Sequence, residues 1–107
     1  MSILTNATAR SAWVKAHVEH AQSTFVDGTN FDFEDAVGLD SPLRAAYADL
    51  VAETAQAFHA AIPGSQVSLD AAWGPFGVDG RFYDWTAIAS AVDIFFVMSY
   101  DTRSAHL

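Results

Sequence analysis

The chain has 107 residues, 51% of them hydrophobic and 13% aromatic, which suits one folded domain with a buried core and is too apolar for a disordered segment. Thirteen acidic residues against five basic ones give a net charge of −8, which excludes a protein that binds by neutralising nucleic-acid or lipid phosphates. The longest apolar run, Ile94–Met98, is far shorter than the roughly 18 residues of a membrane span, and no apolar leader follows Met1. Without cysteine there is neither a disulfide framework nor a thiolate site.

Three stretches have helical spacing. Residues 8–23 are rich in alanine and carry apolar side chains at i, i+4 and i+7, namely Val14, Val18 and Ala21. Ser41-Pro42 is typical of a helix start, because serine caps a helix and proline fits its first position, and helical spacing then continues to Ala61. Pro63-Gly64 ends this second helix, and a third, short helix is expected over residues 85–92.

Three further stretches read as strands, over residues 27–34, 67–73 and 93–100. In the first, Phe31 and Phe33 alternate with polar and acidic residues, which predicts one aromatic face and one acidic face. The second also alternates apolar and polar residues, and Gly and Pro follow it. The third is almost wholly apolar, which is typical of a strand covered on both faces.

Alternating helices and strands predict an α/β fold with a parallel sheet built from right-handed crossovers. Three strands do not complete such a sheet, because both of its faces and both of its edges need cover. We therefore expect this chain to be a fragment of a larger fold. We also expect it to fold poorly or to associate in isolation, because the sheet edges and the face of Phe31 and Phe33 would lack cover.

The first predicted strand carries the residues with the clearest chemistry. Asn30, Asp32 and Glu34 recur at every second position and so project to one side, with the two acids about 7 Å apart. Two carboxylates in one small volume raise the pKa of one of them, as a general acid near neutral pH requires. Glu34, nearest the loop end of the strand, is the expected proton donor. The spacing alone equally allows both acids to face solvent on an edge strand.

Two segments also resemble known signatures. Residues 27–34, DGTNFDFE, resemble the DGxDxDxE signature of the family 18 glycoside hydrolases (chitinases and relatives), with Asn30 where most members have aspartate. In this respect the chain resembles the subgroup of lysosomal chitobiases, which carry asparagine at this position. Residues 96–101, FVMSYD, resemble the MxYD motif of a later strand in the same family. Two motifs in the expected order are far more specific than either one alone.

The resemblance implies a (β/α)8 TIM barrel, of which residues 1–107 would be a partial catalytic domain from about the third helix through the sixth strand. It implies a glycosidase that hydrolyses β-1,4-linked N-acetylglucosamine oligosaccharides with retention, by substrate-assisted catalysis, without a cofactor or a metal. The oligosaccharide would be its partner, and its location would be the lysosome or the extracellular space. The oligomeric state stays open.

The resemblance also assigns roles to individual residues. Glu34 would protonate the glycosidic oxygen, and Asp32 would orient the 2-acetamido group whose carbonyl oxygen attacks the anomeric carbon. Asn30 removes one negative charge beneath Asp32, which changes how protons pass between the acids. Substrate binding would fall to Tyr100, Asp101, Met98, Asn30 and Asp27, with Tyr100 on the acetamide oxygen, Asp101 on the sugar or the Glu34 network, and Met98 lining the pocket.

Other residues allow a functional and a purely structural reading. Asp70 could line the same interior as the two acids, although a polar filler is the more common role for such a residue. His17 and His20 lack the i, i+4 spacing of a zinc helix, which favours a solvated helix face. Trp73 and Trp85 could stack on sugars or pack in the core. Two other interpretations of the whole chain stay open, a sugar-binding protein without catalysis and an inactive truncated fragment.

Overall fold

A computed structural model describes residues 2–74 and 77–99 of the chain. Helices and strands alternate, as the sequence predicts, with an additional short helix at the beginning. In chain order the elements are α1 (Ser2–Thr5), α2 (Ala7–Ser23), β1 (Gly28–Phe31), α3 (Pro42–Ala61), β2 (Gln66–Ala71), a 3-10 turn (Val78–Gly80), α4 (Trp85–Ala91) and β3 (Ile94–Val97).

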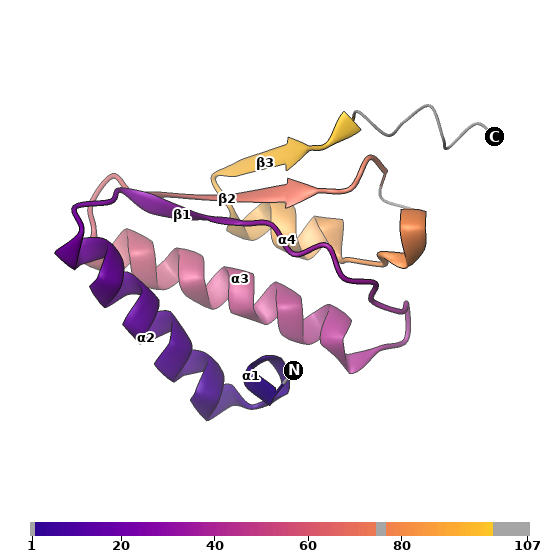
Figure 1. Cartoon of the computed structure of the whole chain (residues 1–107), viewed down its shortest axis with the longest axis horizontal. Coiled ribbons are helices and arrows are strands. Elements are labelled where there is room, and N and C mark those ends of the chain that lie inside the picture. The colour runs from indigo at the N-terminus through magenta and orange to yellow at the C-terminus, as the bar shows by residue number, and fades with distance from the viewer. Residues whose placement is uncertain (1, 75–76, 100–107) are drawn as a thin grey trace.

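The three strands form one parallel sheet in the order β1-β2-β3. The register pairs Phe31 with Leu69 and Leu69 with Phe95, so the three strands run side by side. Figure 1 shows α3 and α4 along one side of the sheet, with α2 packed against α3. The predicted parallel sheet with helical crossovers is therefore confirmed for the described residues.

Polar side chains begin the three longer helices. The Asn6 side chain accepts a hydrogen bond from the Ala9 N–H (3.0 Å), and the Ser41 hydroxyl accepts one from the Leu43 N–H (3.2 Å). The Asp84 carboxyl does the same for α4. Each cap satisfies an N–H group that has no partner within its helix, which fixes where the helix begins. The predicted start of α3 at Ser41-Pro42 is confirmed. None of the described helices has the length and apolar character needed to cross a bilayer.

The core lies between the sheet and α3. Along β2, Val67, Leu69 and Ala71 are buried while the residues between them are not, as the predicted alternation requires. Val51 and Phe58 of α3 are fully buried against this face. Full burial of side chains of this size stabilises a fold by about 1.5–3 kcal/mol each, so α3 and β2 form the centre of the structure. The predicted stripe of α2, Val14, Val18 and Ala21, is also buried.

The expectation that Phe31 and Phe33 lack cover is wrong. Phe31 is 9% exposed and lies edge-on to Tyr47 of α3, with ring centroids 6.1 Å apart. Phe33 is half-buried, and its ring lies 5.0 Å from the Tyr47 ring and 6.0 Å from the Tyr83 ring. The crossover brings α3 back over this face, so the aromatic side of the first strand is covered within the chain itself.

Two predicted strands differ from the observed ones. β1 ends at Phe31, so Asp32, Phe33 and Glu34 continue beyond the paired strand instead of extending it. β3 is not covered on both faces, because Phe96 is 57% exposed and its neighbours Ile94 and Val97 are also exposed. The reason is that the described helices lie along one side of the sheet, so Phe95 packs inward against Trp85 of α4 while Ile94 and Phe96 face the other side (Figure 1).

Candidate active site

The loops that follow β1 and β2 meet at the carboxyl end of the sheet. The Val37 N–H donates to the Gly80 carbonyl (3.0 Å), and the Phe82 N–H donates to the Val37 carbonyl (2.8 Å). The Tyr83 hydroxyl donates to the carbonyls of Phe33 (3.0 Å) and Asp35, and burial raises the pKa of Tyr83 to about 12. These bonds hold the two loops together, at the end of a parallel sheet where binding sites form.

Asp32 and Glu34 lie in the first of these loops, directly after β1, and both side chains are exposed. Their carboxyls share a hydrogen bond, which is the largest cause of a raised Glu34 pKa, followed by the negative charge of Asp32. The structure therefore brings together the two acids that the sequence placed on one side of a strand. The structure also fits the alternative interpretation that both acids face solvent on an edge strand, because β1 lies at the edge of the described sheet and both side chains are exposed.

Arg81, which follows the 3-10 turn, lies against this pair. Its guanidinium Nη2 is 3.7 Å from Glu34 Oε2, and its side chain is 12% exposed. The positive charge lowers the pKa of Glu34, in opposition to Asp32. The same guanidinium lies 6.0 Å above the Trp73 ring. No motif in the sequence pointed to Arg81, although it is one of only five basic residues and falls in the loop after the second strand.

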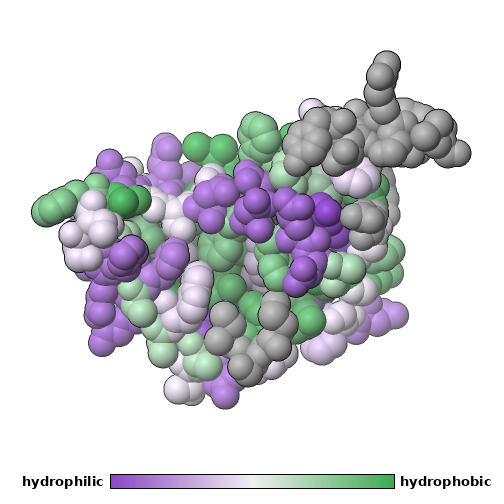
Figure 2. Space-filling model, in the orientation of Figure 1, coloured by the Kyte–Doolittle hydropathy of each residue, from purple (hydrophilic) through white to green (hydrophobic). Residues whose placement is uncertain are grey.

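Two side chains of β2 form hydrogen bonds with the side-chain amide of Asn30 on β1. The Ser68 hydroxyl donates to its carbonyl oxygen (2.6 Å), and its Nδ2 donates to Asp70 Oδ2 (3.1 Å). Asp70 therefore lies on the same side of the sheet as Asn30, as one reading of the sequence expected. Figure 2 shows hydrophilic residues gathered in a band over the strands, beside hydrophobic surface.

The remaining predicted site residues are Asp27, Met98, Tyr100 and Asp101. Asp27 precedes β1 at its amino end, where its carbonyl accepts a hydrogen bond from the Gln66 N–H (2.9 Å). The whole of β1 lies between Asp27 and the acid pair, so Asp27 is at the opposite end of the strand from the two acids. Met98 follows β3 at the carboxyl end and is 8% exposed. Tyr100 and Asp101 fall outside the described residues.

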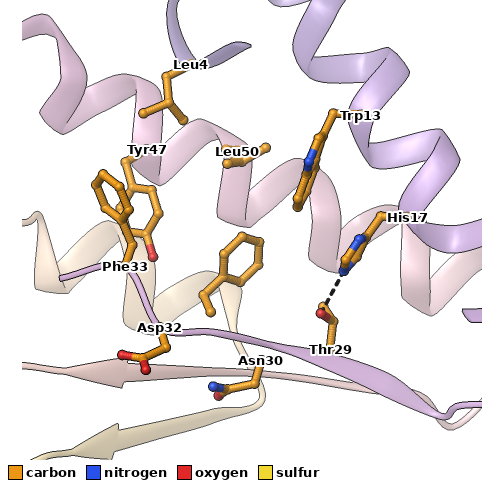
Figure 3. A pocket seen from close by; sticks show the side chains of 10 residues that line it. Leu4, Trp13, His17, Thr29, Asn30, Asp32, Phe33, Tyr47 and Leu50 are labelled. Carbon is orange, nitrogen blue, oxygen red and sulfur yellow. Dashed lines mark hydrogen bonds between the residues drawn. The ribbon is translucent and has the colours of Figure 1, made fainter. Parts of the chain in front are cut away.

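A hollow of about 370 Å³ lies on the aromatic side of β1, between that strand and helices α2 and α3. Figure 3 shows Trp13, Leu50 and Tyr47 on this side, while Asn30 and Asp32 lie on the other side of the strand. Its lining in the described part of the chain is mainly apolar and does not include Glu34. The lining does include Asn30 and Asp32, so the hollow reaches one member of the carboxyl pair.

His17 borders this hollow and corrects one prediction. It does not lie on a solvated helix face: it is half-buried, its ring stacks on Trp13 at 4.7 Å, and its Nε2 is 2.9 Å from the Thr29 hydroxyl (Figure 3). Burial, and then the nearby His20, lower the pKa of His17. The ring therefore joins α2 to β1. Within residues 2–74 and 77–99, no group of three or more His, Asp and Glu side chains could hold a metal ion.

Trp73 and Trp85 have different surroundings. Trp85 packs edge-on against Phe95, with ring centroids 5.0 Å apart, and belongs to the core, which confirms the structural reading for this residue. Trp73 follows β2 at the carboxyl end, is half-buried and carries the Arg81 guanidinium over its ring. Trp73 therefore lies next to the residues that surround Glu34.

Comparisons with known proteins cover nearly the whole chain, including the residues of this site. The sequence model described as Glycosyl hydrolases family 18 matches residues 1–106. Di-N-acetylchitobiase of Rattus norvegicus is 46% identical over 101 residues, which are 94% of this chain and 28% of that protein. Di-N-acetylchitobiase of Homo sapiens is 44% identical over 95 residues, which are 89% of this chain and 25% of that protein.

The fold is also found among solved structures. One of them is the crystal structure of ydhD from Bacillus subtilis, described as a sporulation-specific glycosylase, with a TM-score of 0.78 and 23% sequence identity. The match covers 92% of this chain and 32% of ydhD. The chain therefore spans about a third, or less, of the proteins it resembles.

Proposed function

Because this chain belongs to family 18 of the glycosyl hydrolases, we propose that it is part of a glycosidase that hydrolyses β-1,4-linked N-acetylglucosamine oligosaccharides. The family match over residues 1–106 and the identity to two mammalian di-N-acetylchitobiases support this proposal. The substrate would be a chitin-type oligosaccharide, as the names of those relatives indicate.

The observation that carries the proposal is the carboxyl pair after β1. Glu34 shares a hydrogen bond with Asp32 and has a raised pKa, so it keeps its proton to higher pH than an ordinary glutamate. A carboxyl that is still protonated near the working pH can protonate the oxygen of a glycosidic bond as that bond breaks. Glu34 is accordingly proposed as the general acid.

The remaining steps use the substrate's own acetamide. Its carbonyl oxygen attacks the anomeric carbon while Glu34 protonates the leaving oxygen, which gives an oxazolinium ion. Asp32 orients the acetamide and stabilises the positive charge that develops on it. Water then opens the oxazolinium with net retention, and Glu34, now ionised, takes a proton from that water. Because the acetamide is held next to the reacting carbon, no protein nucleophile is needed.

We further propose that residues 1–107 form part of a (β/α)8 barrel, from about its third helix through its sixth strand. The parallel order β1-β2-β3 and the match to 32% of ydhD support this placement. The open edges of the sheet are where neighbouring barrel strands would pair. Tyr100, Asp101 and Met98 would bind the substrate from the third strand's end. The proposed location is the lysosome or the extracellular space.

The test is turnover by the full-length protein with Glu34→Gln. The amide keeps the shape of the side chain and loses the transferable proton, so release of N-acetylglucosamine from chitotriose should fall at least ~10²-fold while binding persists. Asp49→Asn, at an exposed position on α3, is the matched control and should keep native turnover. Near-native rates for Glu34→Gln would contradict its role as the general acid, whereas binding without turnover in the unchanged full-length protein would favour a sugar-binding protein.

A further inference from the structure

The amide of Asn30 has its orientation set by two neighbours on β2. Ser68, its partner in the strand register, donates its hydroxyl to the carbonyl oxygen of the amide (2.6 Å). The Nδ2 of the amide donates to Asp70 Oδ2 (3.1 Å). Rotating the amide by half a turn would place its carbonyl oxygen against the Asp70 carboxylate, which is repulsive. The N–H group of Asn30 therefore faces Asp70.

This arrangement depends on an amide at position 30. An aspartate there would place a second carboxylate about 3 Å from that of Asp70, and two carboxylates at that distance cannot both stay ionised. Asparagine at this position avoids that repulsion, because its amide donates a hydrogen bond to the Asp70 carboxyl. Asn30 and Asp70 thus form a hydrogen-bonded pair in which the neutral amide lies on β1 and the acidic side chain lies on β2.

The charge of Asp70 acts on one member of the acid pair, Glu34, and on Tyr47 of α3. The pKa of Glu34 is raised mainly by Asp32 and then by burial, it is lowered by Arg81, and the charge of Asp70 on β2 makes the smallest of these contributions by raising it further. On α3, burial is the main cause of the raised pKa of Tyr47, and the charges of Tyr83, Asp32 and Asp70 add to it. Asp32 and Asp70 therefore both raise the pKa of Glu34 and the pKa of Tyr47.

We propose that Asp70 is a positioning residue for the carboxyl pair: it supplies from β2 the fixed negative charge beside Asp32 that Asn30 does not carry, and so keeps a proton on the Asp32–Glu34 pair. Its role in the reaction rests on the proposed function, because Glu34 must be protonated to act as an acid. The local electrostatic relation does not depend on turnover.

The test is a titration of the Glu34 carboxyl carbon by NMR in the full-length protein. Asp70→Asn keeps the size of the side chain and removes the charge, so the Glu34 pKa should shift downward. The exchange variant Asn30→Asp with Asp70→Asn restores one carboxylate and one amide in reversed places, and the Glu34 pKa should return towards the native value. Asp49→Asn removes one charge at an exposed position of α3 and should leave the Glu34 pKa unchanged.

Turnover gives the second readout. The acid must be protonated, so activity is lost as pH rises through the Glu34 pKa. The alkaline limb of the rate profile should therefore move to lower pH in Asp70→Asn and return in the exchange variant. A purely structural Asp70 would lower the melting temperature without moving this limb.

The results separate this inference from the proposed function. Equal Glu34 titration in Asp70→Asn and Asp49→Asn would overturn the role of Asp70, even where Glu34→Gln abolishes turnover. Full activity of Glu34→Gln would overturn the proposed function, even where the Glu34 titration shifts as expected. Where Asp70→Asn does not fold, the exchange variant decides, since a Glu34 pKa below the native value in that variant contradicts the proposal.

Discussion

Arg81 and Glu34 form an ion pair in which the two partners are unequally exposed. Their charged groups lie 3.7 Å apart, with the Arg81 side chain 12% exposed and that of Glu34 48% exposed. The guanidinium is held over the Trp73 ring, while the carboxyl also shares a hydrogen bond with Asp32. The pKa of Glu34 is thus raised by Asp32 and lowered by Arg81.

Removing the charge of Arg81 should raise the pKa of Glu34. Arg81→Gln leaves Asp32 and Asp70 unopposed, so Glu34 should keep its proton to higher pH and the alkaline limb of the rate profile should move upward. NMR titration of the Glu34 carboxyl in the full-length protein measures this directly. Lys15→Gln, on the exposed face of α2, removes an equal charge and should not move the titration. A downward shift in Arg81→Gln would contradict the ion pair.

Asp93 should make stability depend on acidity. The Val67 N–H and then His59 donate to its carboxyl (2.7 and 2.8 Å), which lowers the pKa of Asp93. A lowered carboxyl pKa contributes stability above the ordinary value near 3.8, and this contribution is lost as pH falls through the folded value. Thermal melts of Asp93→Ala should show a lower melting temperature at neutral pH, and the difference should shrink in strong acid. Asp49→Ala should show no such trend.

Two phenylalanines should differ sharply in their effect on stability. Phe58 is 0% exposed at the centre of the core, and Phe25 is 92% exposed. Phe58→Ala should lower the free energy of unfolding by about 3–5 kcal/mol, because it removes buried surface and leaves a cavity. Phe25→Ala should change it by less than about 0.5 kcal/mol. Urea unfolding of both variants measures the difference, and equal losses would argue against this packing.

Gly28 should not tolerate a side chain. A Cβ at this position would lie 1.8 Å from the Gln66 carbonyl oxygen, because β1 begins against the start of β2. Gly28→Ala must push the strands apart at their first pair and should cost about 1–3 kcal/mol. Gly38→Ala is the matched control, since its Cβ would meet nothing closer than the Ser41 Cβ at 3.9 Å. Chemical unfolding of the two variants compares them, and an unaffected Gly28→Ala would mean that the strands are less close.

Local pattern was enough to predict most of the secondary structure. The helix beginning at Ser41-Pro42 and the stripe Val14, Val18 and Ala21 follow from capping and from helical spacing, which act between residues a few positions apart. The parallel order of the strands follows from the alternation of elements, because a crossover through a helix returns the chain in the same direction. The pairing of Asp32 with Glu34 also follows from neighbouring positions in the sequence.

The neighbours of that pair depend on contacts between segments far apart in the chain. The hydrogen bond between Asn30 and Asp70 joins residues 40 positions apart, and Arg81 reaches Glu34 only because the loops after β1 and β2 are bonded to each other. The cover of Phe31 likewise depends on where α3 places Tyr47. No local periodicity encodes these contacts, since their energies depend on the distance between segments that meet only after the sheet and helices have packed. Asp32 and Glu34 lie together because they are two positions apart in the chain, whereas the other charges that act on them come from segments that only the packed sheet brings near.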